Sequence, residues 1–346
     1  MHHNLIVEGT GLQFMTQDVE ENWAAEIAVH LKNRFGLSVR EAAPIDKGWL
    51  NVKWKMITDQ GPVFVKYYHP ERYKLHARPE RRSAIEKTLQ LQNGLSAAGI
   101  PCPGVYLFNG QFIQETPSGL FYTVLDWVDG YTAQAGCLNA AQMFELGAAA
   151  GRMHKWLRSV PPLDKPAWKP DKDAYLKEWQ DNWEKAQAAE DKIVMEWLRR
   201  SQAIVWSLDF RMFESSTTGW LHWDLWVDNM VLNEHGLAGI VDFDRMSMAY
   251  QEIDVARAVL SGALRDGRMR MEAARAFMDG YREQLEVPQG TLTRGMRMLY
   301  LIESLWWLRT EVRTESGLRG LLGRFIEEIH WIEDHWTSLS EQLDTV

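Results

Sequence analysis

Apolar residues repeat every four positions near the start of the chain, at Trp23, Ile27 and Leu31. This period is typical of one face of an amphipathic helix, and Gly36 follows as a typical helix-ending residue. A second helical stretch is predicted over residues 79–97. Between and after these two helices, the apolar residues form short runs typical of strands.

Short strand-like runs make up most of this part of the chain. In 50–58, apolar side chains alternate with lysines, as expected for a half-buried strand. Two apolar runs, 105–108 and 111–114, flank Asn109-Gly110, and Asn-Gly in such a place is a strong hairpin signal. Further strands are predicted at 37–42, 63–68 and 120–128.

After Gly130 the apolar pattern becomes mainly helical, although 220–244 reads as strand and loop. Helices are predicted over 139–158, 171 to about 210, and 250–346. The fold class is therefore α+β with two lobes. We expect a small β-rich N-terminal lobe (1–128), a hinge near 125–130 and a larger, mostly α C-terminal lobe (131–346).

The strand-and-loop run contains the chain's clearest chemical motif. His222, Asp224 and Asn229 have the spacing H-x-D-x-x-x-x-N, and a later apolar strand ends at Asp242. Phosphoryl transfer needs a carboxylate that orients the attacking hydroxyl and oxygen ligands for the magnesium on the nucleotide phosphates. One loop can supply the base and an amide ligand, and the next strand a second carboxylate. In the alternative interpretation, these residues cap a turn and end a surface strand.

A nucleotide-binding lysine is expected on an upstream strand. Lys66 fits, because it lies in the apolar run 63–67 in the manner of the kinase lysine strand. The alternative is a lysine that protects a sheet edge. Glu80 and Glu86 both qualify as its partner in the following helix, and Glu86 is preferred because it is nearer the middle. Glu86 could also be a solvated helix charge.

Together these motifs resemble the aminoglycoside phosphotransferase and choline kinase superfamily, a branch of the protein-kinase-like fold. The nearest resemblance is to the bacterial spore-coat-associated kinase-like group, over residues 48–258. It implies ATP and Mg²⁺ as cofactors, Asp224 as the base, and Asn229 and Asp242 as metal ligands. It also implies that Lys66 holds phosphate.

The resemblance assigns further residues to the nucleotide. Asn51 resembles part of the loop over the phosphates, and the segment with Asp126 and Val128 resembles the hinge whose backbone would hold adenine. Asp254 resembles a structural acid after the metal loop. Two departures stand out: Trp223 replaces the family's usual glycine, and Asp244 is either a further metal-side acid or a turn residue.

Composition narrows the function classes. The 346 residues include 38 basic and 47 acidic ones, so the net charge is 38 − 47 = −9, which argues against a nucleic-acid partner. No apolar run approaches the roughly 18 residues of a membrane span, and we see no signal peptide. Two cysteines, Cys102 and Cys137, cannot form a disulfide framework. We expect a cytoplasmic protein without membrane partners, and the sequence does not indicate its oligomeric state.

The sequence thus predicts an ATP- and Mg²⁺-dependent phosphotransferase that acts on a hydroxyl group of a small molecule. Aminoglycosides, choline-like alcohols, amino alcohols and sugars all remain possible acceptors. One alternative is a kinase-fold structural or binding protein, such as a spore-coat component, with weak or no catalysis. Another is an atypical protein kinase, although no A-P-E segment follows Asp242. Candidate acceptor-lining residues are Trp179, Trp183, Glu303, Trp306 and Trp307.

Overall fold

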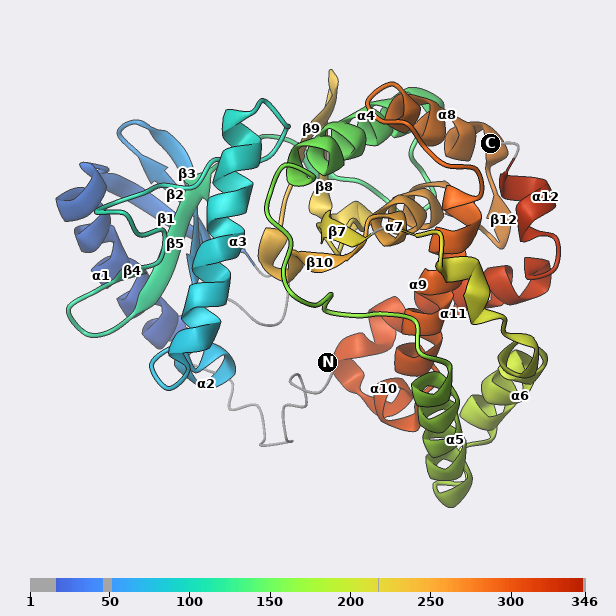
Figure 1. Cartoon of the computed structure of the whole chain (residues 1–346). Coiled ribbons are helices and arrows are strands. Elements are labelled where there is room, and N and C mark those ends of the chain that lie inside the picture. Colours follow the sequence, from blue (N-terminus) through green and yellow to red (C-terminus); the bar gives the residue numbers. More distant parts are fainter. Residues whose placement is uncertain (1–16, 46–51, 217, 345–346) are drawn as a thin grey trace. The chain divides into compact units, whose positions relative to one another are not determined.

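The computed structural model describes residues 17–45, 52–216 and 218–344 (Figure 1). The chain divides into two compact units, and each is described by itself. The first comprises the described residues up to Gly130 together with Ala238–Asp244, and the second comprises Tyr131–Leu237 and the described residues from Arg245 onward. Nothing in the sequence pattern indicated that the chain returns to the first unit at 238–244.

The first unit is built on an antiparallel five-stranded sheet with the order β1-β2-β3-β5-β4. Its strands are β1 (Val39–Pro44), β2 (Val52–Thr58), β3 (Gly61–Tyr67), β4 (Gln114–Glu115) and β5 (Phe121–Asp126). Its helices are α1 (Gln17–Phe35), α2 (Pro70–Tyr73) and α3 (Pro79–Ala97). Both long helices agree with the predicted ones.

Strand alternation divides the core of this unit into two clusters. Val65 and Val124 pack with α1 residues such as Ile27, on one face of the sheet. Phe121 and Leu125 lie in the other cluster, which includes Leu89 of α3. Because successive side chains of a strand point to opposite faces, the position of Lys66 next to Val65 places it on the α3 face.

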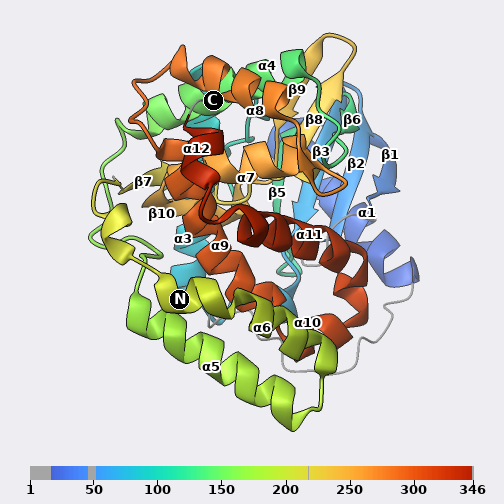
Figure 2. The same ribbon diagram turned by 90° about the vertical axis from the view of Figure 1, so that its right-hand side faces the viewer.

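The second unit is mainly helical, and Figure 2 shows its helices facing the viewer. They are α4 (Ala140–Leu157), α5 (Lys172–Ala188), α6 (Lys192–Ser207), α7 (Glu252–Ala263), α8 (Met271–Arg282), α9 (Thr291–Trp307), α10 (Thr310–Thr314), α11 (Arg319–His335) and α12 (Leu339–Leu343). Short strands accompany them: β6 (Tyr131–Thr132), β7 (Thr218–Leu221), β8 (Met230–Asn233), β10 (Ser247–Tyr250), β11 (Leu264–Arg265) and β12 (Arg268–Met269). Strand β9 (Gly236–Ile240) begins in this unit, and its residues from Ala238 onward belong to the first. No described helix is long and apolar enough to cross a membrane.

One sequence prediction about a single element was wrong, and another holds only in part. The expected helix from 171 to about 210 is two helices, because Glu190 has a positive φ of 53° and Asp191 caps a new helix through the N–H of Val194. The Asn109-Gly110 turn is present, with positive φ at both residues. Two backbone hydrogen bonds between Phe108 and Gln111, both 3.1 Å, close it as a minimal hairpin. The runs beside it do not continue this pairing, because Val105 bridges to Leu125 and Gln114 pairs with Tyr122.

Glycines allow α4 and α8 to pack closely, side by side in both views (Figures 1 and 2). A Cβ on Gly147 would collide with the backbone oxygen of Phe277. We therefore expect Gly147→Ala to lower the free energy of unfolding by about 1–3 kcal/mol, the usual cost of overpacking. Urea denaturation would measure it.

Gly323 provides the matched control for this substitution. It is exposed on α11, and a Cβ there would meet no atom within 4 Å. Gly323→Ala should stabilise the protein by about 0.5–1 kcal/mol, because alanine is the better helix former. Equal effects of the two substitutions would contradict close packing at Gly147.

Candidate active site

A compact charge cluster lies in the first unit, on the α3 face of the sheet. The Lys66 side chain on β3 is only 6% exposed, and its Nζ lies 3.3 Å from Asp242 Oδ1. Lys66 also forms an ion pair with Asp244 Oδ2. Lys53 of β2 is the register partner of Lys66, and its Nζ lies 3.9 Å from Asp242 Oδ2. Two lysines and two aspartates are thus brought together.

The aspartates determine the charge state of Lys66. Burial alone would lower the pKa of Lys66, but the carboxylates of Asp242 and Asp244 raise it well above its ordinary value. The pKa of Lys53 is lowered, mainly by burial, and Asp242 only partly opposes this effect. The two acidic residues therefore favour the charged form of Lys66.

Sequence reasoning missed Lys53. Its only local signal was its place in a strand where lysines alternate with apolar residues. Its proximity to Lys66 depends on the register between β2 and β3, which a single sequence does not reveal.

Asp242 occupies a strained backbone position. Its φ of 63° lies in the left-handed region, which costs a residue with a Cβ about 1–2 kcal/mol. Two positions earlier, the Ile240 N–H donates to the Pro101 carbonyl at 2.8 Å, and the following residue, Phe243, is buried. Strain of this kind persists where the surroundings enforce it, and it is concentrated at functional sites.

Glu86 does not pair with Lys66, contrary to the preferred interpretation of the sequence. Its two carboxylate oxygens accept the backbone N–H groups of Phe112 and Ile113, at 3.1 and 2.8 Å. Among the described residues, no ion pair joins either Glu86 or Glu80 to Lys66. The α3 glutamate therefore holds the segment before β4.

The H-x-D-x-x-x-x-N motif lies in the second unit, directly after β7. Asp254 of α7 is completely buried, and its carboxylate accepts the backbone N–H groups of His222 and Trp223 at 2.6 and 2.8 Å. His154 of α4 adds a third contact, with Nε2 3.0 Å from Asp254 Oδ2. A buried carboxylate thus anchors the start of the loop, which is a structural role of the kind that the resemblance implied for Asp254.

Trp223 has a φ of 71°, in the left-handed region that favours glycine. This gives a physical reason why the resemblance implied glycine at this position. The tryptophan tolerates the conformation because Asp254 binds its N–H group. The strain falls on the residue directly before Asp224.

The rest of the loop leaves two oxygen groups available for chemistry. The Asn229 side-chain nitrogen donates to the Asp224 backbone oxygen at 2.9 Å, so the amide oxygen is the atom that could ligate a cation. The Asp224 side chain is 36% exposed, and its Oδ1 lies 4.0 Å from Arg245 Nη1. His222 is fully buried, and its Nδ1 accepts a hydrogen bond from the Asp224 N–H at 3.3 Å. His222 therefore has a structural role in the loop.

The remaining predicted nucleotide residues are placed as follows. Asn51 lies outside the described residues. Asp126 ends β5, and its carboxylate accepts the Gly104 N–H at 3.1 Å. Val128 lies in the same unit, close to Gly239. A Cβ atom on Gly239 would be 3.2 Å from the Val128 side chain.

The candidate acceptor-lining residues fall into two groups within the second unit. Trp179 is buried, stacks on Trp183 and donates to Ser201, so it is a core residue. Glu303 is different, because its Oε1 lies 3.0 Å from the buried Arg257 and its Oε2 accepts the Trp307 N–H. Its side chain remains 21% exposed.

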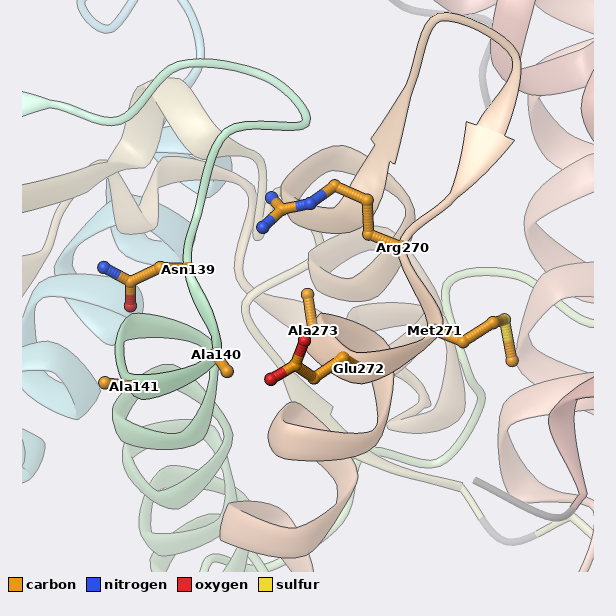
Figure 3. Close-up of a pocket in the computed structure, with 7 residues that line it drawn as sticks. All are labelled: Asn139, Ala140, Ala141, Arg270, Met271, Glu272 and Ala273. Carbon is orange, nitrogen blue, oxygen red and sulfur yellow. The ribbon is translucent and has the colours of Figure 1, made fainter.

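A pocket of about 620 Å³ lies at the beginnings of α4 and α8 (Figure 3). Its lining residues are Asn139, Ala140, Ala141, Arg270, Met271, Glu272 and Ala273. None of them belongs to the predicted site. Arg270 also donates to the carbonyls of Gly136 and Leu138, which gives it a structural function.

Comparison with solved structures identifies the fold. An aminopropanol kinase associated with a microcompartment superposes with a TM-score of 0.63 at 14% identity, over 93% of this chain and 99% of that one. An amicoumacin kinase in complex with AMP-PNP, Ca²⁺ and Ami gives 0.60 at 17% identity, over 92% of this chain and 96% of that one. A spectinomycin phosphotransferase with ADP and spectinomycin gives 0.57 at 14% identity, over 92% and 98%. The predicted α+β, protein-kinase-like fold class is confirmed.

The chain's relationship to a family rests on a separate comparison. No curated protein sequence matches it. The family model described as the phosphotransferase enzyme family matches residues 41–294, which include Lys66, Asp224 and Asp242. The predicted superfamily is therefore confirmed, whereas the nearer resemblance to the spore-coat-associated group stays a prediction. The chain belongs to the phosphotransferase enzyme family.

Proposed function

We propose that this phosphotransferase moves the γ-phosphoryl group of ATP to a hydroxyl group of a small molecule in the presence of Mg²⁺. The observation that carries the proposal is the Lys66–Asp242–Asp244 cluster, in which a buried lysine forms ion pairs with two acids. A buried cation of this kind is suited to bind phosphate oxygens. Solved relatives of the same fold contain AMP-PNP or ADP, which agrees with this reading.

Magnesium, when bound, neutralises charge that develops on the transferred phosphoryl group. The donor atoms fit this ion, because Mg²⁺ prefers carboxylate and amide oxygens together with water. We assign the Asp242 carboxylate and the Asn229 amide oxygen as ligands. The hydrogen bond from Asn229 nitrogen to the Asp224 carbonyl fixes which amide atom is available.

Asp224 is the proposed base. Its carboxylate is partly exposed and its loop is anchored by Asp254 through the two preceding backbone N–H groups. The carboxylate can therefore accept a proton from an alcohol without any change in the loop. In this proposal Lys66 holds phosphate oxygens, and the backbone near Asp126 and Val128 receives the adenine.

The acceptor class is tested by a panel of aminoglycosides, choline-like alcohols, amino alcohols and sugars. We expect one class to increase ADP formation at least tenfold over the rate without acceptor and to yield a phosphate ester. The ester is detected by mass spectrometry. If nucleotide binds but no class accelerates ADP formation, the kinase-fold binding protein becomes the better interpretation.

A further inference from the structure

Lys66 needs a carboxylate partner, and the structure offers a different one from the expected α3 glutamate. Asp244 Oδ2 forms an ion pair with Lys66 Nζ inside the first unit. Its side chain is 24% exposed, and the Tyr73 hydroxyl donates to the same oxygen at 3.4 Å. Asp244 therefore joins the β3 lysine to the short helix α2 that follows it.

Two buried tyrosines lie beside this ion pair, and one of them, Tyr73, contacts Asp244. The rings of Tyr68 and Tyr73 lie 5.0 Å apart, and both side chains are buried. The Tyr68 hydroxyl is buried without a hydrogen-bond partner among the described residues. Because the Lys66 side chain is only 6% exposed, water screens its attraction to Asp244 less than it would at the surface.

Glu86 cannot become the partner of Lys66 without losing the two hydrogen bonds that it now accepts. Its oxygens are both occupied by the N–H groups of Phe112 and Ile113, whose side chains are buried. If the glutamate turned to Lys66, it would leave these two donors unpaired, which is unfavourable in a protein interior.

The balance of charges in the cluster also indicates that Asp244 is the partner of Lys66. Lys53 and Lys66 face Asp242 and Asp244, so the four charges balance. The proposed function, on which this inference rests, commits Asp242 to magnesium. Asp244 is then the carboxylate that remains for Lys66.

We propose that Asp244 is the positioning residue for Lys66 in phosphoryl transfer, and that Glu86 is a structural residue of the first unit. Asp244 would hold the lysine at the place where it meets the phosphates, without itself binding the metal. The two candidate roles of Asp244 weighed from the sequence, a metal-side acid and a turn residue, are both replaced by this one.

A double-mutant cycle on the nucleotide-free protein tests the pairing directly. Lys66→Met, Asp244→Asn and their combination are compared by urea unfolding, next to Lys66→Met, Glu86→Gln and their combination. For Lys66 with Asp244 we expect the unfolding constants to depart from multiplicativity at least fivefold, whereas Lys66 with Glu86 should agree within about twofold. The reverse order would overturn the proposal. Glu80→Gln, an exposed change on the same helix, is the control.

A second measurement separates positioning from metal binding and from a purely structural effect. Asp244→Asn should lower the rate of ADP formation at least tenfold, with the Mg²⁺ concentration for half-maximal rate unchanged within about twofold. Glu86→Gln should keep the rate within about threefold. A raised Mg²⁺ requirement, or an unchanged rate, in Asp244→Asn would overturn the assignment. If the wild type neither binds nucleotide nor forms ADP, the proposed function fails, and the unfolding cycle still decides the pairing.

Discussion

Asp224→Asn is expected to lower the rate of phosphoryl transfer by about a thousandfold, within the range for loss of a general base. The substitution removes one negative charge and keeps the side-chain shape. It leaves the loop contacts in place, because these use the Asp224 backbone N–H and carbonyl. Nucleotide affinity and melting temperature should therefore change little. The rate is measured as ADP formation with the acceptor found in the panel.

Asp228→Asn is the matched control, since Asp228 is an exposed carboxylate four residues later on the same loop. It should keep the rate within about twofold, as expected for a surface change without a partner in the chemistry. A rate for Asp224→Asn close to that of the wild type would show that Asp224 is not the base. An equal loss in both variants would point to the charge of the loop instead.

The second large effect is expected at Asp254, whose loss should destabilise the second unit and abolish activity together. Asp254→Ala would leave three groups without their acceptor: the N–H groups of His222 and Trp223, and the buried His154 ring. Removing one partner from a buried charged network costs about 3–5 kcal/mol. For a unit of this size we expect a drop in Tm of roughly ten degrees.

Calorimetry measures this drop in Tm. Two further variants serve as an intermediate case and as a control. Asp254→Asn keeps one acceptor oxygen, so its Tm should lie between those of the wild type and Asp254→Ala. Asp266→Asn removes the charge of a carboxylate that is 90% exposed, and asparagine tolerates the φ of 50° at this position, so Tm should be almost unchanged. A wild-type Tm for Asp254→Ala would contradict the anchoring role of this carboxylate.

Elements with strong local signals could be predicted from the sequence. The helix at Pro79–Ala97 has proline at its beginning and Gly99 just beyond its end, and both limits agree with the structure. Strand β3 (Gly61–Tyr67) also overlaps the apolar run 63–68 that predicted it. The break between α5 and α6 was missed, because Glu190 carries no side-chain signal for its positive φ.

Some residues of the candidate site could likewise be predicted from the sequence, and others could not. The motif with Asp224 and Asn229 is visible because its members are neighbours along the chain. The partner of Lys66 is not, because Asp244 lies 178 positions away and competes with nearer acids such as Glu86. Similarly, only the folded chain shows that β2 brings Lys53 opposite Lys66. Local pattern therefore identifies chemistry, whereas register and packing decide the pairs.

The central claim, a site for a magnesium nucleotide at Lys66 and Asp242, is tested most directly by the melting temperature of the wild type with ATP alone, Mg²⁺ alone and both. A ligand at a hundred times its Kd stabilises by about 2.7 kcal/mol, which is readily seen. We expect a large increase in Tm only with ATP and Mg²⁺ together, and none in Asp242→Asn. The absence of any shift in the wild type at millimolar nucleotide, or an equal shift in Asp242→Asn, would contradict the claim.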